Sequence, residues 1–75
     1  MNLKITKNGN VISVIYDPDS YKLYEIVTDM LKDSKEFEVF NTMDQMSRKL
    51  QVFDMAHIAR IESKNSITDF IIYKN

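Results

Sequence analysis

The chain has 75 residues, of which 44% are hydrophobic and 28% are charged, and its net charge is −1. This balance is typical of a globular domain and excludes an intrinsically disordered chain. The lack of cysteine excludes disulfides and thiolate metal sites. One domain spanning residues 1–75 is therefore predicted. No apolar run approaches the roughly 18 residues of a membrane span, and no secretory signal is present, so we predict a cytoplasmic location.

The first predicted element is a β-hairpin over residues 3–16. Its centre is the dipeptide Asn-Gly at positions 8 and 9, the strongest short signal for a two-residue type I′ turn. In the register that this turn sets, Lys7 faces Asn10 and Ile5 faces Ile12. Directly opposed residues share a face of the sheet. The predicted apolar face consists of Leu3, Ile5, Ile12, Val14 and Tyr16.

An amphipathic helix is predicted next, at about residues 18–33. Its apolar residues recur at helical spacing, and its charged residues fall on the opposite side. Asp17 is placed to cap the helix, Pro18 suits the first helical position, and Asp19 suits the positive end of the helix dipole.

The segment from residue 36 to residue 62 allows two interpretations, and the favoured one contains strands. Alternation in EFEVFN predicts a strand over 36–41, and a polar loop connects it to a strand over 49–53. A short turn at Asp54–His57 then leads into a further strand near 59–63.

The second interpretation is a helix over about 43–62. Thr42 and Gln45 match a capping box, and apolar residues follow with helical spacings of 3, 4 and 3 as far as Phe53. Val52 lies off this stripe, which is why the strand interpretation is preferred.

The last apolar segment, residues 67–73, is β-branched and aromatic and predicts a closing strand. The predicted fold class is α+β. In the favoured order, ββαβββ, a single-layer antiparallel sheet packs on one helix. The alternative order is ββαβαβ, with the second helix at about 43–62.

No catalytic, cofactor-binding or metal-binding residue is predicted, and we therefore predict no enzymatic activity. His57 is the only histidine, and no Ser, Cys or second imidazole is placed to act with it. Asp17 and Asp19 resemble the start of a calcium-binding loop. Loop positions 6 and 12 hold Lys22 and Thr28, however, so the match fails.

The middle of the chain is acidic, because residues 17–44 hold eight acids and three lysines. These carboxylates suit either a basic partner or the solvated face of a helix. In the favoured interpretation the loop after residue 41 exposes two methionines, which suit adaptable binding surfaces, whereas the helical alternative buries them. The predicted partner-binding residues are Glu25, Asp29, Asp33, Glu36, Met43, Asp44 and Met46.

The favoured functional prediction is a small protein-binding module. It would be an accessory or inhibitor protein that acts by steric docking on a larger protein. A bacterial or phage origin is predicted from composition alone, because eight of the ten basic residues are lysine. No cofactor is expected.

Two alternatives belong to other functional classes. One is a nucleic-acid- or nucleotide-binding regulator that stacks bases on a sheet face and binds phosphates with basic side chains; a net charge near zero argues against it. Its candidate residues are Tyr16, Tyr73, Phe40, Lys4, Lys49, Arg48 and Arg60. The other is a self-associating structural subunit, that is, a homo-oligomer.

Overall fold

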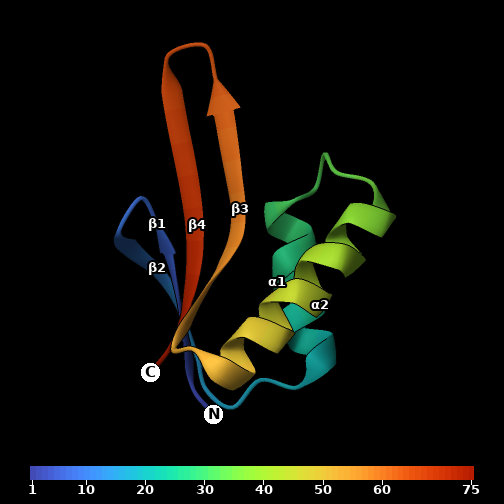
Figure 1. Cartoon of the computed structure of the whole chain (residues 1–75), viewed down its shortest axis with the longest axis vertical. Coiled ribbons are helices and arrows are strands. Elements are labelled where there is room, and N and C mark those ends of the chain that lie inside the picture. The colour runs from blue at the N-terminus through green and yellow to red at the C-terminus, as the bar shows by residue number, and fades with distance from the viewer.

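The computed structural model describes residues 1–75 as a four-stranded antiparallel sheet with two helices on one of its faces (Figure 1). The chain order is ββααββ, and the strand order in the sheet is β2-β1-β4-β3. The last strand, β4, therefore lies between β1 and β3. The elements are β1 (Leu3–Lys7), β2 (Asn10–Ile15), α1 (Ser20–Met30), α2 (Glu36–Val52), β3 (Met55–Ser63) and β4 (Ser66–Lys74).

The predicted class, α+β with an antiparallel sheet, is confirmed, but the order ββαβββ is wrong. Residues 36–41 and 49–52, predicted as parts of two strands, both belong to α2. The buried residues of this helix, Val39, Met46 and Leu50, recur every seven and four residues, with the half-buried Met43 between the first two. This is one continuous helical stripe. The short alternation around Val39 does not distinguish a strand from the first turn of that stripe.

The alternative helix over 43–62 is correct only in its first half. Phe53 has an extended backbone, with φ −116° and ψ 163°, and its N–H closes the last turn of α2 on the carbonyl of Lys49. From Met55 onward the chain is β3. The predicted turn at Asp54–His57 is thus shortened to residues 53 and 54, and His57 lies in a strand.

The N-terminal hairpin forms around the predicted turn, since both Asn8 and Gly9 have positive φ. Lys7 faces Asn10 as predicted, but the register shifts farther along because Ile12 forms a β-bulge. Beyond the bulge, Leu3 faces Ile15 and not Val14. A one-residue shift moves every following side chain to the other face. Ile15 is consequently buried, whereas Ile12, Val14 and Tyr16 are exposed.

The first helix is shorter than predicted, and a different residue caps it. Asp19 is the N-cap, and its carboxylate accepts a hydrogen bond of 2.7 Å from the N–H of Lys22. Asp17 has a φ of 47° and lies outside the helix. The Asp19 cap satisfies one of the free N–H groups of the first turn. Leu31, at the C-cap, is buried in the core.

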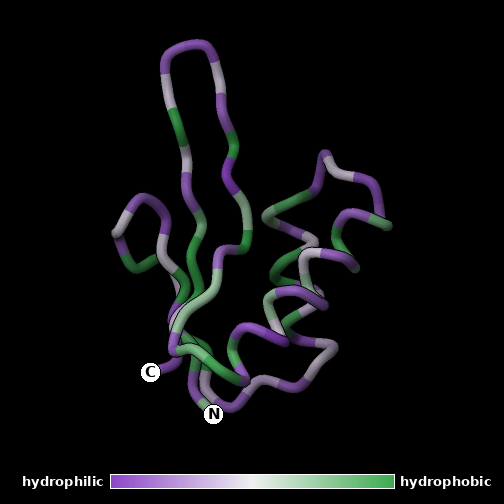
Figure 2. The backbone as a smooth tube through the Cα atoms, viewed as in Figure 1, coloured by the Kyte–Doolittle hydropathy of each residue, from purple (hydrophilic) through white to green (hydrophobic).

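The core lies between the helices and the sheet face that they cover. Hydrophobic residues follow β1 and the lower part of β4, whereas the loop that joins β3 to β4 is hydrophilic (Figure 2). Twelve hydrophobic residues form one buried cluster. They are Leu3, Ile5, Ile15, Val27, Leu31, Val39, Met46, Leu50, Ala56, Ile58, Phe70 and Ile72.

The outer part of the β3–β4 hairpin projects beyond the rest of the molecule (Figure 1). Pairing of β1 with β4 ends at Phe70, so the residues of β4 before Phe70 pair only with β3. We call the part from Arg60 to Asp69 the ribbon. Neither helix is long and apolar enough to cross a membrane.

Candidate functional site

Four aromatic side chains lie along the helix pair, two on each helix. Tyr24 of α1 stacks on Phe40 of α2, with ring centroids 5.3 Å apart and an angle of 27° between the rings. Tyr21 and Phe37 each lie three residues before one of these rings and are its neighbours on the helix surface. Tyr21 is 76% exposed and Phe37 is 72% exposed. We call these four residues the aromatic cluster.

The aromatic cluster lies at the margin of the core. Val27 of α1 and Val39 of α2 point into the core and are almost fully buried. Tyr24 lies one helical turn before Val27, is half-buried and packs against the core, whereas Phe40, next to Val39, is 52% exposed. The stack therefore joins the two helices beside the core, and the rings of Tyr21 and Phe37 next to it are exposed to solvent.

The surroundings of the aromatic cluster are acidic. Six carboxylates and three lysines lie between Ser20 and Asp44. Glu25 follows Tyr24 directly, and Asp44 lies one helical turn after Phe40. Asp44 also forms an exposed ion pair of 3.1 Å with Arg48. A surface of this kind, with aromatic anchors and carboxylates at the rim, suits a partner that is apolar and basic.

The structure separates the seven predicted partner-binding residues into two groups. Met46 is fully buried and Met43 is half-buried, so α2 removes from the surface the methionines that the predicted loop would expose. The five acids lie on the helix layer, outside the core. They are Glu25 and Asp29 on α1, Asp33 between the helices, and Glu36 and Asp44 on α2.

A groove of about 670 Å³ between β2 and α1 brings some of these charges together. Glu25, Asp29 and Lys32 line it beside Ile12 of the bulge. The hydroxyl of Thr28, also at the groove, is buried without a hydrogen-bond partner. No group of three or more His, Cys, Asp or Glu side chains is placed to hold a metal ion.

The other face of the sheet has no helix over it. Lys4 lies over the ring of Tyr73, 5.4 Å from its centroid. This is the only part of the nucleic-acid alternative that the structure assembles. Phe40, Arg48 and Lys49 belong to α2 in the helix layer, so the aromatic and basic residues of that alternative do not form one surface.

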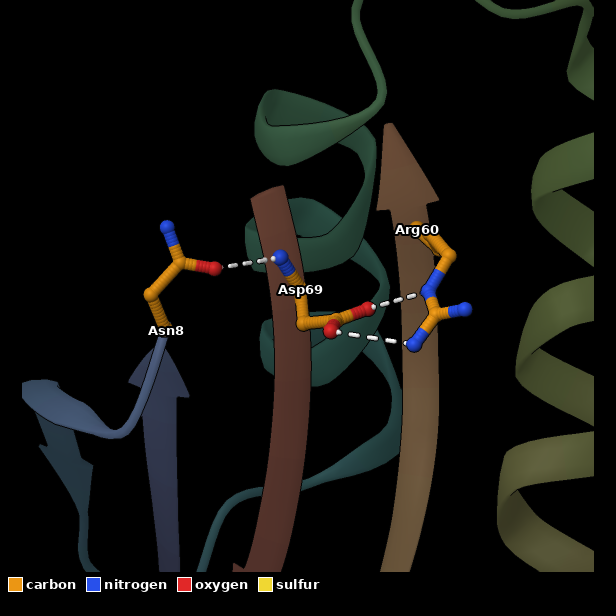
Figure 3. Close-up of polar contacts among 3 residues, drawn as sticks. All are labelled: Asn8, Arg60 and Asp69. Atoms are coloured by element: carbon orange, nitrogen blue, oxygen red, sulfur yellow. Dashed lines mark hydrogen bonds and ion pairs between the residues drawn. The ribbon is translucent and has the colours of Figure 1, made fainter. Parts of the chain in front are cut away.

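A polar network links the two hairpins at the base of the ribbon (Figure 3). The guanidinium of Arg60 donates two hydrogen bonds to the carboxylate of Asp69, at 2.9 and 3.3 Å. The N–H of Asp69 donates to the side-chain oxygen of Asn8 at 2.8 Å, and the N–H of Asn8 donates to the carbonyl of Asp69 at 2.9 Å. The turn of the first hairpin therefore holds β4 at this point.

The Arg60–Asp69 pair of this network should make the stability difference between the wild type and an Asp69 variant depend on pH. Hydrogen bonds from Arg60, with added attraction from the charges of Arg60 and His57, lower the pKa of Asp69 below its usual 3.8. Because the folded protein favours the ionised carboxylate, Asp69 stabilises the fold at pH values above its pKa in the unfolded chain. This stabilisation is lost as the pH falls through the pKa of Asp69 in the folded protein. We expect Asp69→Asn to be less stable than the wild type at neutral pH and equally stable in strong acid.

The measurement is urea unfolding of both proteins across the acidic range. In an Arg60→Gln background the Asp69→Asn substitution should remove little further pH dependence, because the partner charge is already gone. Parallel stability curves for the wild type and Asp69→Asn would contradict the assignment.

Sequence reasoning named Phe40 only as a base-stacking residue and missed Phe37 and the two tyrosines of α1. The available signal was a pair of aromatic residues spaced by three in each helix, at positions 21 and 24 and at 37 and 40. That spacing indicates a common face only if residue 37 lies in a helix. The strand interpretation of residues 36–41 therefore concealed the aromatic cluster.

Comparison with known proteins assigns no family to this chain: no family model, no curated protein and no solved structure matches it.

Proposed function

We propose that this protein is a protein-binding module that docks through the aromatic cluster onto a basic, partly apolar segment of a larger protein. The observation that carries the proposal is the exposure of Tyr21 and Phe37 beside the Tyr24–Phe40 stack. Exposed aromatic side chains that belong to one contiguous surface are typical of interaction sites. The module would act by occupying its partner's surface, with no chemical step.

The charge distribution supports a basic partner. Carboxylates outnumber lysines two to one between Ser20 and Asp44, the segment that contains the aromatic cluster. Glu25 and Asp44 flank the cluster, and opposite charges at the rim of an interface steer association and add specificity. Raising the ionic strength should therefore slow association more than it changes dissociation.

Selection from a random displayed-peptide library tests the proposal, because such a library contains peptides of every charge and hydropathy from which the aromatic cluster can select. We expect enrichment of peptides that combine Lys or Arg with apolar residues. Truncation of an aromatic anchor typically costs about 2 kcal/mol, or roughly 30-fold in Kd. Calorimetry with a selected peptide should therefore show this loss for Tyr21→Ala and for Phe37→Ala.

Val52→Ala provides a matched control, because Val52 is a 75% exposed apolar residue of α2 that lies outside the aromatic cluster. This variant should bind the selected peptides with unchanged affinity. If no basic peptide is enriched, or if Phe37→Ala and Val52→Ala bind equally well, the aromatic cluster is not the docking site.

A further inference from the structure

The free edge of β3 is a second feature of the molecule that could bind a partner, in this case another β-strand. In the strand order β2-β1-β4-β3, both β2 and β3 are edge strands. Unpaired N–H and C=O groups along an edge form a template for another strand, and bulges or short lengths normally protect against such pairing. Strand β2 has six residues and carries the bulge at Ile12. Strand β3 has nine residues and also carries a bulge, at Ile58, but from Ala59 to Ser63 its register with β4 is regular.

The hairpin geometry determines which backbone groups of β3 are free. Ser63 pairs with Ser66 across the two-residue loop, and this pair exchanges backbone hydrogen bonds within the hairpin. Because the bonding direction alternates along a strand, the backbone groups of Ile61 also point toward β4. Those of Arg60 and Glu62 point toward the free edge. A strand added at this edge must therefore bond to Arg60 and Glu62.

The charges on this edge are self-complementary about a two-fold axis. In an antiparallel pair of two β3 strands centred on Ile61, Arg60 of each copy lies opposite Glu62 of the other copy. A register centred one residue earlier would oppose Arg60 with Arg60. A register centred one residue later would oppose Glu62 with Glu62. Opposite charges directly across a strand pair stabilise it and like charges destabilise it, so the register centred on Ile61 is the favourable one of these three.

The apolar residue at the centre of this register is also exposed. Ile61 is 46% exposed and belongs to the ribbon, whose tip projects beyond the helices (Figure 1). In the two-fold register it opposes Ile61 of the second copy in a non-hydrogen-bonded pair, where side chains approach most closely. Arg60 is already held in place by Asp69, which limits the side-chain entropy lost on binding.

We propose that two copies of this chain pair antiparallel through residues 59–63 of β3 and join their sheets into one. The pairing uses the free backbone groups of Arg60 and Glu62, two inter-copy Arg60–Glu62 ion pairs and the central Ile61 contact. It involves none of the residues of the aromatic cluster, so the dimer leaves the proposed docking surface free and presents two copies of it.

A charge-exchange experiment tests both the dimer and its register. Sedimentation equilibrium should show a wild-type dimer at concentrations up to about 1 mM, the affinity of a weak complex. Arg60→Glu or Glu62→Arg alone places like charges opposite each other twice in every dimer, and we expect each to weaken self-association roughly tenfold or more. Mixing the two variants in equal amounts restores opposite charges at both positions, so a heterodimer should form.

Lys64→Glu is the control for register, because residue 64 lies opposite the uncharged Ile58 in the register centred on Ile61, whereas registers centred on Glu62 or Ser63 would place it opposite Arg60 or Glu62. It should dimerise as the wild type does. Circular dichroism should show that all variants are folded, since Arg60, Glu62 and Lys64 are exposed. A strictly monomeric wild type, or a mixture of the two charge variants that stays monomeric, would overturn the proposal. Loss of peptide binding in Tyr21→Ala without loss of the dimer would separate the two surfaces.

Discussion

Ile72→Ala is expected to remove a large part of the stability of this fold. Ile72 is fully buried in β4, where it faces Ile5 of β1 on one side and Ala56 of β3 on the other. Truncation of a buried isoleucine to alanine costs about 2–5 kcal/mol, because the transfer free energy is lost and a cavity remains. A 75-residue domain has a total stability of roughly 4–11 kcal/mol at typical values per residue. We therefore expect Tm to fall by roughly 10–30 °C.

The matched control is Ile67→Ala, the same substitution in the same strand at a residue that is 55% exposed. It should cost less than about 1 kcal/mol, since little apolar area is lost and no cavity forms. Both variants should be unfolded by heat and by urea at low protein concentration, where self-association does not contribute to Tm. Equal losses for the two variants would mean that β4 does not present Ile72 to the core.

Gln45→Pro should destabilise the protein by about 3 kcal/mol, because residue 45 lies in the interior of α2. Gln45 is exposed, so no packing is lost. The cost comes from the removed backbone N–H, which leaves the carbonyl of Asn41 without its helical partner, and from the clash of the proline ring with that turn. If residues 42–48 were a loop between two strands, proline at this position would cost little.

Glu36→Pro is the companion variant, placed at the first residue of the same helix. Proline is favoured at this position, and Lys35 before it has an extended backbone, with φ −70° and ψ 148°, that a following proline requires. We expect stability within about 0.5 kcal/mol of the wild type. Circular dichroism and urea unfolding measure both variants. Tolerance of proline at residue 45, or equal damage at residues 36 and 45, would contradict the boundaries of α2.

The first hairpin and the first helix could be predicted because their signals are local. The Asn-Gly turn needs two residues with positive φ, and Asn8 and Gly9 adopt them. The helix is indicated by a stripe of apolar residues and by carboxylates near its start, although Asp19 and not Asp17 is the cap. The closing strand predicted over 67–73 was indicated by β-branched and aromatic residues and corresponds to β4, and the strand predicted near 59–63 is the second half of β3.

The residues of the proposed docking surface were harder to predict, because their position depends on the assignment of α2. The five acidic side chains lie outside the core under either interpretation of the sequence. Met46 changes from a predicted surface residue to a core residue once residues 36–52 are a single helix. The same change turns Phe37 and Phe40 into neighbours on a helix surface. Because residues 36–41 were predicted to be a strand, the predicted binding surface contained Met43 and Met46 and lacked Phe37 and Phe40.

The sequence by itself determined the α+β class, the turn at Asn8 and Gly9, the first helix and an acidic middle segment, since each of these depends on residues close together in the chain. The tertiary structure decided three further features. It placed β4 between β1 and β3, it made residues 36–52 helical, and it inserted bulges at Ile12 and Ile58. The physical reason is that these features depend on which strands become neighbours. Both sides of β4 are paired with other strands, so Val39 and Leu50 become buried as parts of a helix that covers the sheet. Each bulge turns its strand, and Ile15 of β2 and Ile58 of β3 thereby reach the shared core.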